Sequence, residues 1–118
     1  MRHIRIATTS GIALATRVSV ASSFRARLIG LLSRASLEPD EGLWLEPGGS
    51  VHTLGMRFPI DVVFLSDELK VLKVTSSLPP RRFAFAPRRT RYVLELTAGH
   101  AARCGIEVGT ELVAGGLQ

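Results

Sequence analysis

The chain has 118 residues, of which 46% are hydrophobic, and its formal net charge is +5. This length predicts one domain spanning residues 1–118, and the apolar fraction excludes a chain that stays disordered for want of a core. The single cysteine excludes an internal disulfide, and the lack of any run of about 18 apolar residues excludes a membrane-spanning helix.

The N-terminal residues carry positive charge, as a targeting segment would. Residues 1–5 contain two arginines and no acidic residue. The stretch that follows, residues 6–23, is interrupted by threonine, serine and arginine, whereas a signal peptide requires about 7–15 apolar residues in succession. We therefore expect no signal peptide and no anchor, and the expected compartment is the cytoplasm.

Short apolar runs separated by turn residues dominate the chain. Runs that alternate apolar and polar residues predict half-buried strands. We expect strands at residues 4–6, 12–15, 17–20, 43–45, 51–56, 60–65, 69–74, 92–96 and 111–113. The expected fold is therefore mostly β, a compact sandwich, jelly-roll-like or barrel-like single domain with minor helix.

Two helices are expected among these strands. Residues 24–34 place apolar side chains at helical spacing along one stripe, so this amphipathic helix should pack on the sheet. Arg27 and Arg34 fall together along one edge of that stripe. A second, short helix is expected at residues 98–104, with Gly105 as the residue that ends it.

Three motifs in order resemble the signatures of one protein family. Residues 24–34 read FRARLIGLLSR, residues 52–64 read HTLGMRFPIDVVF, and residues 93–109 contain VLEL, AG, GI and a further glycine. This arrangement, over roughly residues 12–113, resembles the domain of unknown function 192 family. The resemblance implies a compact jelly-roll-like β fold with a packed helix, and it implies no established activity.

The chain departs from many members of that family in two respects. Many members carry a signal peptide or an anchor. Many also have an aromatic residue and an asparagine in the stretch that matches residues 52–56, where His52 and Gly55 stand here, as in another branch of the family.

Asp61 is the most informative polar residue, because it begins a run, residues 61–65, that is apolar on both faces of a strand. Such runs are buried on both sides, and a buried carboxylate is costly unless it has a partner. Arg57, Arg27 and Arg34 are the candidate partners. The carboxylate would lock helix to sheet, bind a ligand, or act with His52 in general acid–base chemistry.

His52 would share one strand face with Met56 if the period of two holds. A histidine among apolar residues is usually structural. We expect no metal site and no cofactor, because His3, His100 and Cys104 do not form a recognisable ligand spacing. His100 and Cys104 are four residues apart, and packing across one helical turn is the expected role of that pair.

Basic residues gather in residues 81–91, RRFAFAPRRTR, which contain no acidic residue. Arginine beside stackable rings can bind single-stranded nucleic acid, and an anionic small molecule or an acidic protein would suit the same charges. The alternative is a solvated loop in which Phe83 and Phe85 face the core. The arginines of this patch are Arg81, Arg82, Arg88, Arg89 and Arg91.

The sequence contains no recognisable phosphate-binding loop, paired metal motif or nucleophile elbow. It therefore favours a non-enzymatic binding or accessory domain, whose pocket would be lined or braced by Arg27, Arg34, Arg57 and Asp61. Two alternatives stay open. One is an enzyme that acts on a small or anionic substrate through Asp61 and His52, and the other is nucleic-acid binding through residues 81–91.

Overall fold

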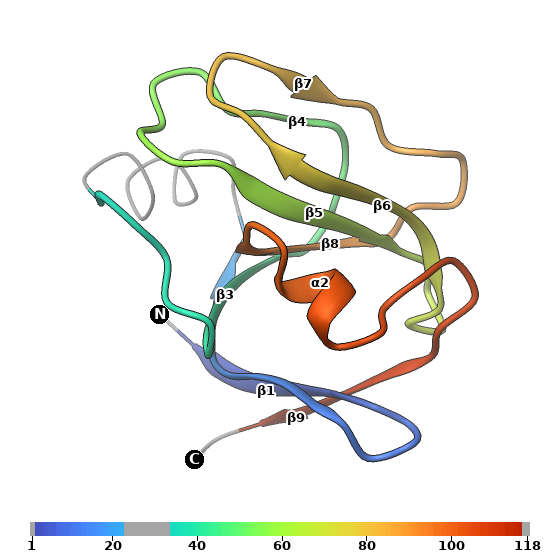
Figure 1. Ribbon diagram of the computed structural model, residues 1–118. Helices are drawn as coiled ribbons and strands as arrows, with labels where there is room; N and C mark the ends of the chain where they lie inside the picture. Colours follow the sequence, from blue (N-terminus) through green and yellow to red (C-terminus); the bar gives the residue numbers. More distant parts are fainter. Residues whose placement is uncertain (1, 23–33, 117–118) are drawn as a thin grey trace.

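The computed structural model describes residues 2–22 and 34–116, in which β-structure predominates (Figure 1). The elements in these ranges are β1 (His3–Thr8), β2 (Ala13–Ala21), β3 (Glu41–Leu45), β4 (Val51–His52), β5 (Ile60–Leu65), β6 (Val71–Leu78), β7 (Phe83–Ala84), β8 (Tyr92–Thr97), α2 (His100–Arg103) and β9 (Leu112–Gly116). The expected mostly β fold is confirmed. The helix expected at residues 24–34 lies, apart from Arg34, outside the described residues.

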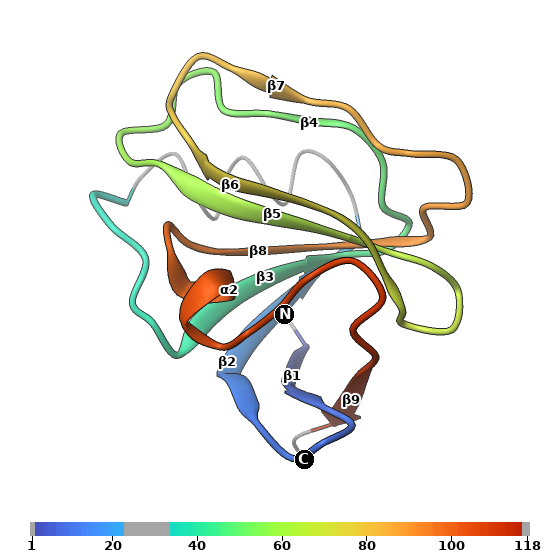
Figure 2. The ribbon, with the colours of Figure 1, turned by 45° about the vertical axis from the view of Figure 1, so that its right-hand side comes forward.

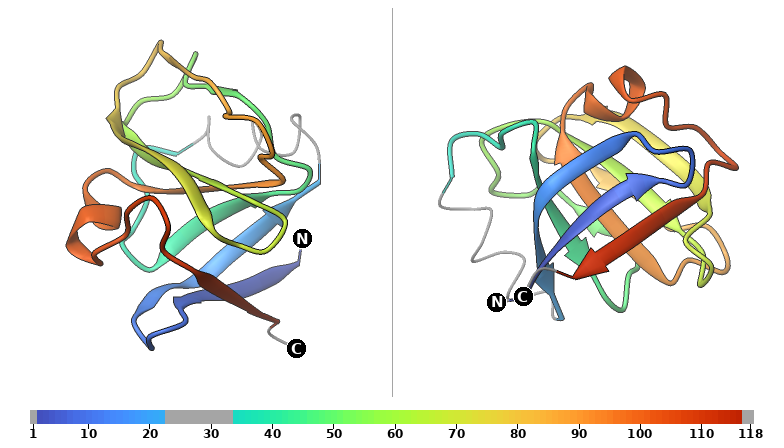
Figure 3. Two further views of the ribbon diagram at one scale, coloured as in Figure 1. Left: turned by 90° about the vertical axis from the view of Figure 1, so that its right-hand side faces the viewer. Right: turned by 90° about the horizontal axis from the view of Figure 1, so that it is seen from below.

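Seven strands form one strongly curled sheet in the order β6-β5-β8-β3-β2-β1-β9. Its edge strands β6 and β9 meet at one end, because the Val71 amide donates to the Thr110 carbonyl at 2.8 Å and the Leu112 amide donates to the Leu69 carbonyl at 2.9 Å. The sheet is therefore a half-closed barrel, as the view from below in Figure 3 shows. Pairing of the two edges also removes donors and acceptors that could otherwise recruit another chain.

Curling gives the sheet an inner and an outer face, and both are buried along β5. All six residues of β5 are buried. Val63 and Leu65 belong to one apolar cluster with Trp44, which we call the inner core. Val62 and Phe64 belong to a second cluster, the outer core. The apolar run that was expected to be buried on both sides is thus confirmed, with one core on each side of it.

A separate two-stranded sheet, β4 and β7, covers the outer core (Figure 2). Val51 of β4 and Ala84 of β7 lie opposite each other in register, and both side chains belong to the outer core. The prediction of a strand at residues 51–56 is wrong beyond His52. The physical reason is Gly55, whose φ of 84° turns the chain out of the extended conformation.

The helix α2 is a single turn whose Ala101 packs into the inner core. A helix this short is not stable alone, so its ends must be tied. At its C-terminal end the amides of Gly105 and Ile106 donate to the carbonyls of Ala102 and Ala101 at 3.0 and 2.9 Å, the pattern of a Schellman motif. Gly105 has a φ of 72°, so its predicted role as the residue after the helix is confirmed.

The N-terminal end of α2 is held by Asp61, which is fully buried on the inner face of β5. Its Oδ1 accepts hydrogen bonds from the amides of Ser77 and Gly99 at 2.8 and 3.0 Å, and its Oδ2 accepts one from Ala101 at 2.9 Å. The predicted arginine partner is therefore wrong for the described residues. Free backbone amides at the start of a helix need an acceptor, and this carboxylate supplies it from a strand 40 residues earlier.

Replacement of Asp61 by alanine would leave three backbone amides without their acceptor, one in a buried and two in partly buried hydrogen bonds. We expect Asp61→Ala to lower the free energy of unfolding by about 3 kcal/mol, since a buried unpaired donor costs about 1–3 kcal/mol and a partly buried one less. The melting temperature should fall by on the order of 10 °C. Asp61→Asn keeps one carbonyl oxygen and should lose less. Thermal unfolding followed by circular dichroism measures both, and an unchanged melting temperature in Asp61→Ala would contradict this role.

Candidate functional site

Asp61 and His52 lie on different sides of the curled sheet. Asp61 points to the inner side of β5, where backbone amides occupy both of its oxygens. His52 is half-buried on β4, beyond the outer core, and its Nδ1 accepts a hydrogen bond from the Leu54 amide at 3.2 Å. Because β5 and the outer core separate the two side chains, they do not share a cleft, which an enzyme built on both would require.

Within the described part of the chain, the other candidate residues do not bind the Asp61 carboxylate. The guanidinium of Arg34 donates to both carboxylate oxygens of Glu41, at 2.8 and 2.5 Å. Arg57 is exposed, whereas Met56 is buried in the outer core. Arg27 lies outside the described residues. The structure therefore does not bring Arg34 and Asp61 to one pocket.

Several of the predicted residues do meet on the flap, by which we mean residues 50–56 and 79–91. Thr53 is its buried fixed point, because its hydroxyl donates to the Pro79 carbonyl at 2.6 Å and accepts from the Arg82 amide at 2.9 Å. The Ala86 amide donates to Ser50 Oγ at 2.8 Å. These side-chain bonds hold the two segments together where the β4–β7 ladder has only two residue pairs.

The rings of Phe83 and Phe85 form the exposed face of the flap. Their side chains are 57% and 67% exposed, and their ring centroids lie 6.3 Å apart with 13° between the ring planes. The expectation that both rings face the core is wrong. The alternation is real, but its register places Ala84 against the outer core, where Val51 lies opposite. Because successive side chains of a strand point to opposite faces, Phe83 and Phe85 point to solvent when Ala84 points to the core.

Cations share the flap with these rings. The Nζ of Lys73, on β6, donates to the Phe85 carbonyl at 3.0 Å and brings a further positive charge to the flap. No carboxylate of the described residues forms an ion pair with the flap arginines, since the ion pairs of that part of the chain lie elsewhere. The arginines concerned, all exposed, are Arg81, Arg82, Arg88, Arg89 and Arg91.

Glu95 is a buried acid that sequence reasoning did not select. It lies on β8 in register with Leu43 and Val62, whose side chains belong to the outer core, and it is fully buried. The available signal was a charge inside the apolar run VLEL, since a carboxylate is rarely buried unless it is engaged. Glu95 is not a free carboxylate.

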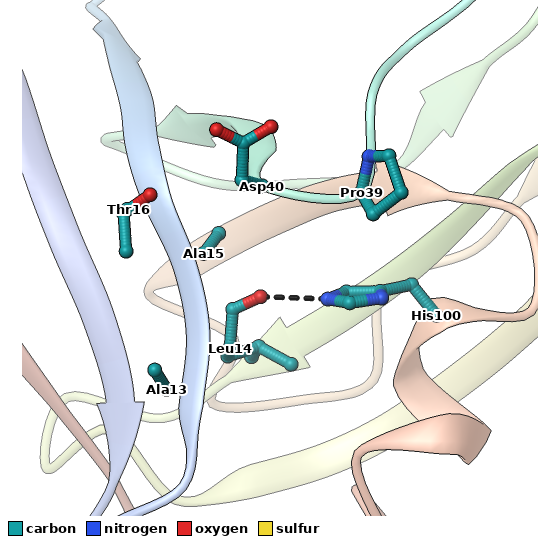
Figure 4. A pocket seen from close by; sticks show the side chains of 7 residues that line it. All are labelled: Ala13, Leu14, Ala15, Thr16, Pro39, Asp40 and His100. Atoms are coloured by element: carbon teal, nitrogen blue, oxygen red, sulfur yellow. Dashed lines mark hydrogen bonds between the residues drawn. The ribbon is translucent and has the colours of Figure 1, made fainter.

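A second polar cluster joins α2 to β2 (Figure 4). The Nε2 of His100 lies 2.7 Å from the Leu14 carbonyl oxygen and 3.6 Å from Cys104 Sγ. The hollow beside it measures about 180 Å³, and Asp40, the acid on its wall, is bound by Arg17. Small-molecule sites usually exceed about 300 Å³. We therefore assign His100 the role of a brace between helix and strand.

Within residues 2–22 and 34–116, no three histidine, cysteine, aspartate or glutamate side chains are grouped so that they could hold a metal ion. In the same ranges, no helix has the length and apolar character required to cross a membrane.

The bridge between Arg34 and Glu41 should make stability depend on pH. Hydrogen bonds from Arg34 hold the pKa of Glu41 below its ordinary value of 4.5, against the opposing effect of burial. A carboxyl group whose pKa is lowered by folding stabilises the fold above its unfolded pKa, and this stability is lost as the pH falls through the folded pKa.

We expect Glu41→Gln to lower the free energy of unfolding at pH 7 by about 0.5–1 kcal/mol, the upper range for a partly exposed ion pair. The difference from wild type should shrink as the pH falls below 4.5, because wild-type Glu41 then becomes protonated as well. Urea unfolding at neutral and acidic pH measures this. A difference that stays constant with pH would mean that the bridge contributes no electrostatic stability.

Comparisons with known proteins agree with this fold. The family model of the domain of unknown function 192, described as an uncharacterised ACR, matches residues 5–114. A UPF0127 protein of Pyrococcus furiosus is 34% identical over 107 residues, which cover 88% of this chain and 91% of that protein.

Two crystal structures are similar over nearly the whole chain. A protein of unknown function from Novosphingobium aromaticivorans superposes with a TM-score of 0.80 at 25% identity, over 94% of this chain and 83% of its own. A protein from Sinorhizobium meliloti, provisionally described as a transcription regulator, gives a TM-score of 0.78 at 26% identity, over 96% and 92%. The predicted resemblance is confirmed, and the chain belongs to the uncharacterised domain of unknown function 192 family.

Proposed function

We propose that this domain is a non-enzymatic binding module that holds single-stranded nucleic acid on its flap. The observation that carries the proposal is the pair of exposed, nearly parallel rings of Phe83 and Phe85 beside arginines that have no acidic partner among the described residues. Burial of one such ring would stabilise a fold by about 1.5–3 kcal/mol. A contiguous apolar patch that forgoes this gain is typical of an interaction surface.

Single-stranded nucleic acid offers a matching group for each kind of side chain on the flap. Its unpaired bases stack on exposed aromatic rings, and the stacking tolerates any base because every base has a π face. Its phosphates accept paired hydrogen bonds from arginine guanidinium groups. The net charge of +5 would also draw a polyanion towards the domain.

The backbone of the flap supports the same proposal. Arg81 and Arg89 have φ angles of 65° and 72°, in the left-handed region that side chains other than glycine rarely adopt. Such strained conformations persist where the surrounding bonds impose them, and they cluster at binding sites. Here the buried Thr53 forms hydrogen bonds with the backbone before and after Arg81, which fixes the backbone positions from which the arginine side chains extend.

An acidic polypeptide is the competing partner, because its carboxylates would meet the same arginines. Two flat rings 13° from parallel favour flat partners, and bases are flat whereas acidic side chains are not.

An enzyme that uses Asp61 and His52 is not supported, since the two lie on opposite sides of β5. The provisional description of the Sinorhizobium protein as a transcription regulator belongs to that protein and agrees with a nucleic-acid partner. A cytoplasmic location, which we propose from the sequence, would give access to one.

Fluorescence anisotropy with labelled oligothymidine and oligouridine tests the proposal. We expect binding to weaken about 50-fold between about 50 mM and 200 mM salt if four arginines contact phosphates, because each contact releases counterions. Phe83→Ala and Phe85→Ala should each weaken binding by about 5- to 150-fold, since stacking on one ring contributes about 1–3 kcal/mol.

Matched controls for this experiment lie outside the flap. Val108→Ala removes another exposed apolar side chain, 68% exposed, and should leave the affinity unchanged. Arg5→Gln removes an exposed arginine of β1 and should change the salt dependence less than Arg82→Gln does. No binding at low salt would reject the proposal. Binding of polyglutamate that survives loss of both rings would assign the flap to an acidic protein instead.

The fixed point of the flap can be tested separately. Thr53→Val keeps the shape of the side chain but removes the bonds to Pro79 and Arg82, so it should lower the free energy of unfolding by about 1–3 kcal/mol. Amide hydrogen exchange should quicken in residues 79–86. The matched control is Thr75→Val, because the buried Thr75 hydroxyl has no hydrogen-bond partner within residues 2–22 and 34–116, and its loss should be neutral or stabilising. Equal effects of the two substitutions would contradict the assigned role of Thr53.

A further inference from the structure

The strand β9 has backbone groups that no other strand of the described part of the chain pairs with. One side of β9 is paired with β1, and β9 forms the end of the seven-stranded sheet (Figure 3). On its other side, within the described residues, the last hydrogen bond runs from the Leu112 amide to the Leu69 carbonyl. In an antiparallel pair, alternate residues direct both backbone groups away from the partner strand. The Leu112 carbonyl, both backbone groups of Ala114 and the Gly116 amide therefore point away from β1, and we call them the open edge.

The open edge has none of the features that normally protect the edge of a sheet. Residues 113–116 read VAGG and contain neither a charged side chain nor a proline. Their register with β1 is continuous, without a bulge. Proteins usually protect an exposed edge with charge, proline or a bulge, because its unpaired N–H and C=O groups recruit other strands. The open edge is therefore suited to the addition of one extended peptide.

A hollow lies beside the open edge, at the end of the barrel. It measures about 390 Å³, within the range of about 300–1,000 Å³ that is usual for binding pockets. Ala114 contributes to its wall, and the other apolar side chains there are those of Ile4, Trp44, Leu69 and Tyr92. A strand added to the open edge would have to end at Leu69, which already occupies the position beside Leu112. The terminal side chain of that strand would then enter the hollow.

The charges around the hollow favour an anion. Arg2 and Glu46, which both line it, form an ion pair. Arg91 adds a second cation, because its guanidinium lies 5.2 Å from the ring centroid of Tyr92, another lining residue. The ion pairs of the described part of the chain do not include Arg91. Two cations and one carboxylate leave one net positive charge, and a guanidinium can bind a carboxylate through two parallel hydrogen bonds.

We propose that the open edge and the hollow together bind the C-terminal segment of a partner protein, as a strand antiparallel to β9. Because β9 runs away from Leu69, an antiparallel strand runs towards Leu69 and brings its C-terminus to the hollow. A parallel strand would bring a positively charged amino group to the same two arginines. The terminal carboxylate binds Arg91, the last apolar side chain fills the hollow, and the peptide backbone pairs with Ala114 and Gly116. The binding is reversible and involves no covalent step.

Unlabelled heptapeptides test this proposal on the full chain. Their sequence is Gly-Ser-Thr-Val-Thr-Val followed by valine, leucine or isoleucine with a free carboxylate. Trp44 is the only tryptophan in the chain and lines the hollow, so its emission should change saturably with at least one of them. Replacement of the carboxylate by an amide should raise the Kd by about 10- to 150-fold, the range expected when hydrogen bonds to a charged group are lost. Arg91→Gln should weaken binding of the free acid by a similar factor.

The open edge can be tested without breaking the pairing of β9 with β1. Proline lacks an N–H, and the Ala114 N–H points away from β1, so Ala114→Pro should keep the fold and weaken the best peptide at least fivefold. Thermal unfolding checks that the variant is folded. Amide hydrogen exchange of the wild-type chain needs no substitution, and exchange at Ala114 and Gly116 should slow when the peptide saturates the protein.

Control variants separate this site from the flap, of which Arg91 is the last residue. Phe83→Ala, which should weaken oligothymidine binding, should leave the peptide Kd unchanged, so failure of either proposal is distinguishable from failure of the other. Arg5→Gln removes an exposed arginine from the outer face of β1 and should also leave it unchanged. No saturable change with any of the peptides would overturn the proposal. So would equal affinity for the amidated peptides, or unchanged exchange at Ala114 and Gly116.

Discussion

The carboxylate of Asp61 joins three parts of the chain that no local interaction would bring together. Its two oxygens accept hydrogen bonds from the amide of Ser77 near the end of β6, from that of Gly99 just before α2, and from that of Ala101 within α2. A one-turn helix has more unsatisfied amides than intrahelical bonds. It is therefore stable only where the rest of the fold supplies an acceptor for those amides and a surface to pack against. Once it is anchored, Ala101 and Ile106 close one end of the inner core. The closed end in turn allows the sheet to curl until its edges meet at residues 69–71 and 109–112.

Curling has a consequence for the surfaces that the molecule exposes. A sheet that buries both of its faces needs a second layer outside, and β4 and β7 supply that layer with only two residue pairs. Because the layer is so narrow, every second side chain of β7 and its extension faces solvent. These side chains are phenylalanines, and the neighbouring arginines have no acidic partner among the described residues. The open end of the barrel is the other place where the interior reaches the surface, and it is there that Trp44 lines a hollow. One constraint, the need to cover a curled sheet on both sides, thus generates two distinct surfaces with different chemistry.

Sequence patterns located most strands, the short helix and its terminal glycine, because these depend on local periodicity and on the conformational freedom of Gly105. They failed where the outcome depends on a partner distant in sequence. The alternation of Phe83, Ala84 and Phe85 predicts a strand with one buried face, but it does not specify which face, and the register with Val51 decides that small residues go inside. Asp61 was recognised as a buried acid that needs partners, yet amides of α2 rather than arginines fill that role.

By itself, the sequence determined that this is one mostly β domain, that it belongs to a recognisable family, and that two segments, residues 1–37 and 81–91, carry arginines and no acids. These properties follow from composition, spacing and motif order, which are independent of how distant segments meet. Only the tertiary structure decided that His52 and Asp61 lie on opposite sides of one strand, and that two aromatic rings face solvent. It also decided that Arg2, Glu46 and Trp44 share one hollow. The physical reason is that a strand has two faces whose environments are set by the neighbours across the sheet, and those neighbours come from elsewhere in the chain.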